Sequence, residues 1–227
     1  MKINKQLSGS RTNVVLLNFT AEQLKWLGAV AMAYNDAEMT LHKMFGACIF
    51  LPIDTYEISS RINGTEGLAV VIRATAAKLI PNPDILESVI PVLADFGQLK
   101  CYRDLVIHAR VIDTKTAYAE RPERRGKRSY TTLTAEALKA LCTHLSSLNE
   151  EMLTLVNLID RAKLLFFGRA ADDQHKVQLG AAIQDGLVRA QSHRNHRQYL
   201  PPLPKLPQEG RPDRNNQGAR RKRKASP

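Results

Sequence analysis

Cysteine is scarce in this chain of 227 residues, and the few that occur form no recognisable pattern. Cys48, Cys101 and Cys142 lie far apart and include no C-x-x-C pair, which suits a reducing compartment and argues against a disulfide framework. The first twenty residues lack the apolar core of a secretory signal, and no stretch approaches the about twenty apolar residues of a membrane span. We therefore expect a soluble cytoplasmic protein that makes no membrane contact.

The common signatures of cofactor and metal chemistry are also missing. The sequence has no glycine-rich phosphate loop, no nucleophile elbow and no Cys/His cluster with metal-ligand spacing. His193 and His196 are three residues apart, but they stand among arginines with no thiol nearby. Nucleic-acid contact or simple solubility explains these histidines better than a metal does. No metal and no cofactor are predicted.

Positive charge is what the chain has in excess. The formal net charge is +11, and the surplus gathers in two segments. Residues 205–227 hold eight Lys or Arg against two acids, and Glu120–Arg128 holds five against two. Such a concentration in loops and tails indicates a polyanionic partner, most often nucleic acid. The alternatives are a solubilising tail without a specific partner, or a nuclear address at Arg220–Lys224.

Hydrophobic periodicity and helix-capping residues predict an all-α fold. Thr20–Gln23 has the form of a capping box, Asn82-Pro83 suits a helix start, and Gly168 suits a helix end. The predicted helices span about residues 20–51, 56–79 with an interruption at Asn63-Gly64, 132–167 and 172–191, and a further helix runs from residue 82 into Cys101–Arg110. We expect an antiparallel bundle of four to five helices with a disordered, basic C-terminal tail.

The expected organisation along the chain has four parts. They are an N-terminal arm over residues 1–19, a helical domain over 20–167, a C-terminal helical extension over 168–199 and a disordered Pro-rich and basic tail over 200–227. Within the helical domain, the polar segment Ala119–Ser129 contains Pro122 and Gly126 as breakers. We expect this segment to be a mobile surface loop.

The stretch Cys101–Arg110 is where we expect chemistry. It holds a guanidinium at Arg103, a carboxylate at Asp104 and an imidazole at His108. On a helix Asp104 and His108 share a face, so the carboxylate can orient the imidazole. Arg103 stands roughly 140° around the helix from His108. It reaches the same spot only through its long side chain, a helix end or irregularity, or a second copy of the chain.

An arginine followed by a histidine is a weak signal on its own, because two other pairs with similar spacing occur later in the chain. Arg103 and His108 differ from these pairs in context. They lie late in a predicted helix, a polar residue follows the arginine, and a basic segment comes next. The plainer interpretation remains a helix-surface histidine that pairs locally with Asp104.

In this frame, Arg103-Asp104-Leu-Val-Ile-His108 resembles the motif of HEPN (higher eukaryote and prokaryote nucleotide-binding) domains, which has an arginine, a polar residue and then a histidine. The resemblance covers about Thr20–Phe167, including the order of the helices. Many HEPN members are metal-independent ribonucleases whose dimers bring two motifs into one cleft. The resemblance therefore implies RNA as substrate and a homodimer, and allows an antitoxin or regulatory protein as a partner. Arg110 stands where one toxin branch of the family has a tyrosine, which argues against that branch.

The resemblance also implies roles for individual residues. His108 would act as general acid or base on the RNA 2′-hydroxyl or the leaving oxygen. Arg103 would bind the scissile phosphate and stabilise the transition state, while Asp104 would hold the imidazole. Asp36 and Glu38 on the first helix could face the motif, although a solvated face is the simpler interpretation. The residues expected to bind RNA phosphates are Arg110, Arg121, Arg124, Arg125, Lys127 and Arg128.

A non-catalytic module is the alternative function. In that case the helical bundle, HEPN-like or unrelated, would bind a nucleic acid or a partner protein through its basic loop and tail. Contacts to backbone phosphates predict an affinity that falls steeply with salt and depends little on base sequence.

Overall fold

The structure is a computed structural model that describes residues 19–49, 56–62, 64–80, 82–108, 110–113, 118–122, 128–168 and 172–203. Between residues 108 and 132 it describes the backbone of the helix end and of the strands, but no side chains. The expected N-terminal arm and nearly all of the basic tail therefore lie outside the described residues.

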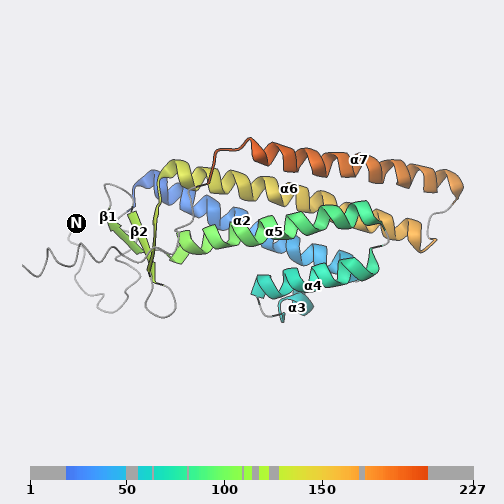
Figure 1. Ribbon diagram of the computed structural model, residues 1–227, viewed down its shortest axis with the longest axis horizontal. Helices are drawn as coiled ribbons and strands as arrows, with labels where there is room; N and C mark the ends of the chain where they lie inside the picture. Colours follow the sequence, from blue (N-terminus) through green and yellow to red (C-terminus); the bar gives the residue numbers. More distant parts are fainter. Residues whose placement is uncertain are drawn as a thin grey trace, which may run out of the picture.

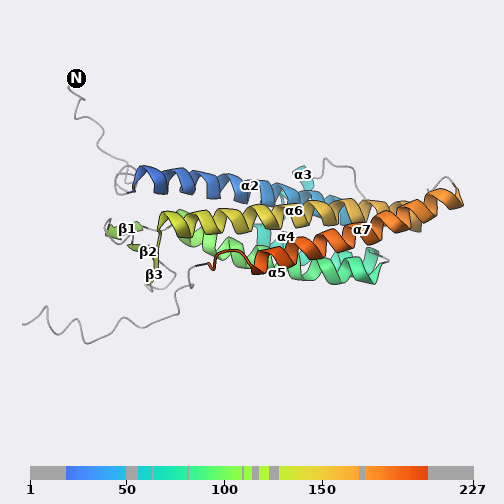
Figure 2. The same ribbon diagram turned by 90° about the horizontal axis from the view of Figure 1, so that it is seen from above.

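The described chain is a bundle of long helices, which confirms the all-α prediction (Figure 1). α5 and α7 run antiparallel to α6, whereas α2 runs parallel to it (Figures 1 and 2). A single turn, α3, precedes α4 on the outer side of α2. The helices are α2 (Ala21–Ile49), α3 (Tyr56–Ser59), α4 (Gly64–Leu79), α5 (Pro83–His108), α6 (Ala135–Phe166) and α7 (Asp173–Gln198).

Local side-chain chemistry sets where these helices begin. The capping box at the start of α2 is formed, because Thr20 Oγ1 accepts a hydrogen bond from the Gln23 amide at 3.1 Å and Gln23 Oε1 accepts one from the Thr20 amide at 2.8 Å. At the start of α6, Thr134 Oγ1 accepts from the Ala137 amide at 3.1 Å. The Asn82 side chain caps α5 in the same way.

Two glycines mark the breaks that the sequence predicts. Gly64 has a φ of 67° at the start of α4, and Gly168 has a φ of 63° just after α6. This left-handed region is costly for residues with a Cβ. The interruption at Asn63-Gly64 and the helix end at Gly168 are therefore confirmed. The last predicted helix is longer than expected, because α7 continues to Gln198.

The most extensive helix contact in the bundle joins α2 and α6. The inward stripe of α6 is fully or almost fully buried over its whole length, and it meets the apolar face of α2. The largest buried side chains of this seam include Leu41, Met44, Leu138, Leu145, Leu148, Met152 and Leu155. None of the helices in the described ranges combines the length and the apolar content needed to cross a membrane.

A small antiparallel sheet at one end of the bundle is a correction to the predicted loop. Its strands are β1 (Arg110–Asp113), β2 (Tyr118–Pro122) and β3 (Arg128–Thr132), in the order β1-β2-β3 (Figure 1). The prediction of a surface loop over Ala119–Ser129 is therefore wrong at both ends of that segment. β3 is rich in residues that favour strands, and the breaker Pro122 sits at the last pair of the β2–β3 ladder, where it is tolerated.

Helix α7 packs tightly against α6 at Gly186. A Cβ built on this glycine would lie 2.3 Å from Cδ2 of Leu158, whose side chain is only 1% exposed. A glycine is therefore required for the two helices to pack at this distance. Gly180 in the same helix has open space around its Cα, with nothing within 4 Å of a built Cβ.

We predict that Gly186→Ala lowers the free energy of unfolding. The added methyl group overpacks the α6–α7 contact at a cost of about 1–3 kcal/mol, which exceeds the gain in helix propensity. Gly180→Ala is the matched control and should raise stability by up to about 1 kcal/mol. Urea denaturation followed by circular dichroism measures both. Equal stability of the two variants would show that the α6–α7 packing is looser than described.

Candidate functional site

The predicted motif occupies the last turns of α5, before the chain enters the sheet. Arg103 and Asp104 lie between Lys100 and the helix end at His108. The His108 backbone is helical, but its side chain lies outside the described side chains. The predicted contact between Asp104 and His108 is therefore neither confirmed nor contradicted.

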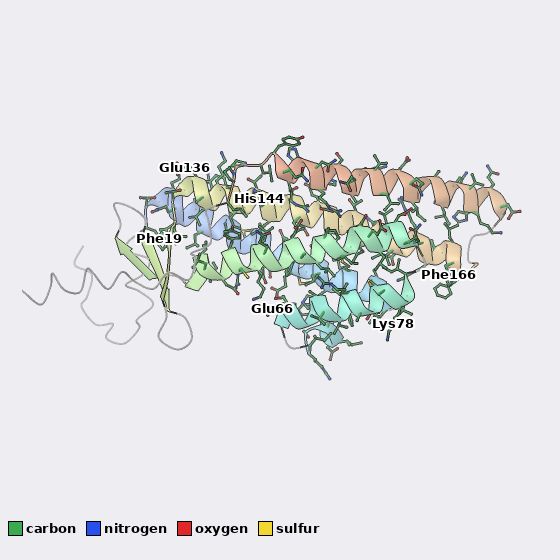
Figure 3. All side chains as sticks on the ribbon, in the orientation of Figure 1. Phe19, Glu66, Lys78, Glu136, His144 and Phe166 are labelled. Carbon is green, nitrogen blue, oxygen red and sulfur yellow. The ribbon has the colours of Figure 1, made fainter. Side chains whose placement is uncertain are left out.

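Arg103 and Asp104 face a shallow pocket of about 380 Å³ formed by three helices. The first turn of α4 closes one side, and α2 and α5 form the others, with Glu66 at the start of α4 beside α5 (Figure 3). The pocket is lined by Tyr34, Glu38, Gly64, Thr65, Glu66, Lys100, Arg103 and Asp104.

The Arg103 side chain is held in this pocket by two contacts. Its Nη1 donates to Asp104 Oδ1 at 3.0 Å, and the guanidinium carbon lies 4.5 Å from the centroid of the Tyr34 ring. Its Nε is buried and has no hydrogen-bond partner among the described residues. The side chain is still 29% exposed. The guanidinium is thus fixed in position by Asp104 and Tyr34, while the side chain stays partly exposed.

Lys100 completes the pocket from one turn earlier on α5. Its Nζ donates to Asp104 Oδ2 at 2.8 Å and to Glu66 Oε1 at 3.2 Å. Burial would raise the pKa of the Asp104 carboxyl, but the hydrogen bonds from Lys100 and Arg103 outweigh it and hold the pKa below the ordinary value of 3.8. The hydrogen bond to Asp104 raises the pKa of Lys100, against the effect of burial. Asp104 is thus a carboxylate clamped between two cations.

Of Asp36 and Glu38, for which a solvated face was the simpler interpretation, Glu38 faces the motif and Asp36 does not. Glu38 lines the pocket, and burial raises its pKa against the opposing charges of Arg103 and Lys100. Asp36 is exposed on another face of α2. Tyr34 lines the pocket one turn before Glu38, and its burial also raises its pKa. The pocket therefore contains two cations facing three carboxyl groups.

Three of the six predicted RNA-binding residues lie on the sheet. Arg110 pairs in register with Glu120, and Arg121 pairs with Ser129. Arg128 opens β3 opposite Pro122. The remaining three, Arg124, Arg125 and Lys127, lie outside the described residues. The structure places the backbone of the first three in one sheet that directly follows the motif helix.

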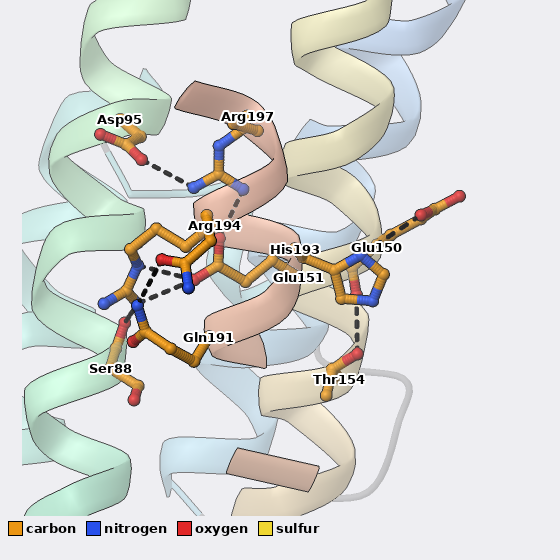
Figure 4. A network of polar contacts seen from close by, with 10 residues as sticks. Ser88, Asp95, Glu150, Glu151, Thr154, Gln191, His193, Arg194 and Arg197 are labelled. Atoms are coloured by element: carbon orange, nitrogen blue, oxygen red, sulfur yellow. Dashed lines mark hydrogen bonds and ion pairs between the residues drawn. The ribbon is translucent and has the colours of Figure 1, made fainter. Parts of the chain in front are cut away.

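A second polar cluster, absent from the predictions, lies between α5, α6 and α7 (Figure 4). The Glu151 side chain is 0% exposed and accepts from Arg194 through Nη2 at 2.7 Å and Nε at 3.1 Å. Arg197 forms ion pairs with Glu151 and, at 2.7 Å, with Asp95. The cluster contains two cations and two anions, so it is charge-balanced.

This cluster corrects the interpretation of the basic C-terminal part of α7. Arg194 also donates to the Ser88 carbonyl at 2.9 Å, so it joins α7 to α5 as well as to α6. Arg194 and Arg197, which surround the histidines expected to contact nucleic acid or to aid solubility, are therefore paired inside the bundle. The position of Glu151, three residues after Leu148 on the buried stripe of α6, is the sequence signal that indicates a buried carboxylate with partners.

A buried serine–histidine pair joins α3 to α2. His42 Nδ1 lies 2.5 Å from Ser59 Oγ, and the His42 ring meets Tyr56 edge-on at 4.8 Å. Burial lowers the pKa of His42, which favours the neutral ring. Ser59 is 1% exposed, so this pair is inaccessible to a substrate and serves to hold α3 in place. Within the described ranges, no group of three metal-ligating side chains lies together.

We predict that Asp104 stabilises the fold in a pH-dependent way. Because its pKa is lowered in the folded state, this contribution is fully present above the ordinary value of 3.8 and is lost as the pH falls through the lower folded value. The difference in unfolding free energy between wild type and Asp104→Asn should be constant from about pH 7 to 5 and shrink near about pH 3. Asp36→Asn is the control, because it shows how the loss of an exposed carboxylate changes the unfolding free energy over the same pH range. If the difference in unfolding free energy between wild type and Asp104→Asn grew as the pH falls, the pairing of Asp104 with Lys100 and Arg103 would be contradicted.

We also predict that Glu151→Ala destabilises the fold by about 3–5 kcal/mol, because it leaves two arginines with unpaired charge inside the bundle. The neighbouring Glu150, whose side chain is 65% exposed, is the matched control, and Glu150→Ala should change stability by less than about 0.5 kcal/mol. Urea denaturation at neutral pH measures both variants. Similar effects of the two substitutions would mean that the buried cluster does not hold α7.

Comparison with known proteins found no match to this chain. No family model matches the sequence, no curated protein matches it, and no solved structure matches the fold. The HEPN assignment therefore stays a prediction that rests on the motif and its helical frame.

Proposed function

We propose that this protein is a metal-independent endoribonuclease of HEPN type, with a catalytic site formed by two copies of the chain. One observation carries the proposal. Arg103 of the Arg-Asp-x3-His motif is held by Asp104 near the end of α5 with its side chain 29% exposed, and the sheet that follows α5 carries further arginines.

Arg103 is suited to bind the scissile phosphate. Its contacts with Asp104 and Tyr34 fix the plane of the guanidinium before a substrate arrives, and a planar donor can hold two phosphate oxygens at once. Such preorganised donors stabilise the negative charge that develops in the transition state. In this proposal Asp104 is a positioning residue for Arg103, in addition to its predicted contact with His108.

His108 carries the proton transfers. The 2′-oxygen of the RNA attacks the adjacent phosphorus as its proton passes to a base, and the bond from phosphorus to the 5′-oxygen breaks as that oxygen takes up a proton. The products are a 2′,3′-cyclic phosphate and a 5′-hydroxyl. An imidazole titrates close enough to neutrality to serve at either oxygen.

A second copy of the chain would bring an arginine and a histidine together, which one α5 helix does not do by itself. On a straight helix the Cβ atoms of Arg103 and His108 point roughly 140° apart, and the Arg103 side chain is committed to the pocket beside α2 and α4. We therefore propose that Arg103 of one copy works with His108 of the other. The ends of two α5 helices would meet at this site.

The test is cleavage of single-stranded RNA by the full chain in the presence of a chelator. We predict that His108→Ala lowers the cleavage rate by about 10²–10⁴-fold and Arg103→Ala by about 10²–10³-fold. Arg189→Ala and His196→Ala, which remove exposed side chains of the same types from α7, should cleave like wild type. RNA with 2′-deoxy substitutions should resist cleavage.

A second candidate function is supported by the charge balance of the Arg103 pocket. Three carboxyl groups, from Glu38, Glu66 and Asp104, surround two cations there. This composition suits a structural ion-pair network in a non-catalytic module that binds nucleic acid or protein. Salt-dependent RNA binding without cleavage by wild type would favour this module and overturn the ribonuclease.

A further inference from the structure

The only tryptophan of the chain, Trp26, lies between two lysines near the start of α2. Nζ of Lys25 is 5.5 Å from the Trp26 ring centroid, and Nζ of Lys139 on α6 is 5.7 Å from it. The ring is partly buried and packs on the core, whereas both lysines are exposed. A partly buried ring thus holds two ammonium groups from different helices near one point of the surface.

This cluster lies at the end of the bundle that carries the sheet. Gln23, one turn before Trp26, donates from Nε2 to the Leu133 carbonyl at 2.8 Å, which ties α2 to the residue after β3. Lys139 lies in the second turn of α6, which β3 leads into. The starts of α2 and α6 and the end of α5 all face the sheet (Figures 1 and 2).

Neither lysine is neutralised by a partner in the part of the chain that the structure describes. The nearest acids in sequence, Glu22 and Glu136, are exposed in the first turns of α2 and α6 and form no ion pair with either lysine. Carboxylates at these positions are already stabilised by the positive ends of the helix dipoles. Two ammonium groups near one ring repel each other, and an anion bound between them would relieve this repulsion.

We infer that Lys25, Trp26 and Lys139 form a contact surface for the backbone of single-stranded RNA. The inference rests on the proposed function and extends the substrate path from the motif across the end of the bundle. The lysines bind successive phosphates, and their contact with the ring limits the side-chain freedom that binding would otherwise remove. The partly exposed ring offers an apolar contact to an unpaired base, which the paired bases of a duplex cannot make as readily.

The test uses the single tryptophan as its own reporter. Full-length protein carrying His108→Ala, to prevent cleavage, is titrated with an oligouridylate of about twelve nucleotides while the Trp26 fluorescence is followed at several salt concentrations. Quenching is expected. The Lys25→Gln/Lys139→Gln double variant should bind several-fold more weakly, and its salt dependence should fall by about 1.4 in slope, which corresponds to two lost phosphate contacts on a single strand.

The matched control removes the same charge elsewhere. Lys78 lies at the far end of the bundle from Phe19 (Figure 3), and Lys176 begins α7 at that far end. Lys78→Gln/Lys176→Gln should keep the wild-type slope. Absence of quenching, or a Lys25/Lys139 variant with the same affinity and slope as this control, would overturn the inference.

Cleavage by protein with His108 intact separates the two proposals. Quenching and a reduced slope without cleavage would leave the RNA surface standing and remove the ribonuclease. Cleavage by protein with His108 intact, together with an unchanged salt-dependence slope in the Lys25/Lys139 variant, would support the ribonuclease and remove the RNA surface.

Discussion

Burial of the apolar stripe of α6 against α2 is the contact on which the rest of the structure depends. These two helices run parallel through the middle of the bundle, and the other long helices pack on the seam they form (Figure 1). Because both begin at the same end, α2 and α6 place Trp26 and Lys139 side by side, and α6 receives β3 there. The motif helix α5 returns to that end, so the features on which the proposed function rests lie towards one end of the molecule.

Charge is used in two ways in this bundle. Inside it, Glu151 and Asp95 pair with Arg194 and Arg197, and these ion pairs supplement the few buried apolar residues of α7. At the motif, the Arg103 pocket is nearly compensated as well, but it stays open to solvent. Lys25 and Lys139 are among the described cations that form no ion pair, and they lie at the end of the bundle that carries the sheet, while the largest surplus of the sequence lies in the tail. We therefore propose that the pocket orients one phosphate and that the surrounding surface supplies most of the affinity.

Features governed by local chemistry could be predicted from the sequence. The Thr20–Gln23 capping box and the breaks at Gly64 and Gly168 depend on neighbouring residues, and each was confirmed. The strands could not be predicted, because the polar and basic residues of Tyr118–Pro122 show no alternation, and strand pairing depends on distant residues. The inward direction of Arg194 depends on a partner 43 positions earlier. The Arg103 pocket likewise required Tyr34 and Glu66, which no spacing within the motif indicates.

The central claim is that Arg103 and His108 of different copies form one ribonuclease site. The most direct measurement mixes the Arg103→Ala and His108→Ala proteins after subunit exchange and compares RNA cleavage with that of each parent and of wild type. A shared site predicts recovery of about a quarter of wild-type activity, because about half of the dimers are mixed and each of these has one intact site. A mixture as inactive as its parents, beside an active wild type, would contradict the claim.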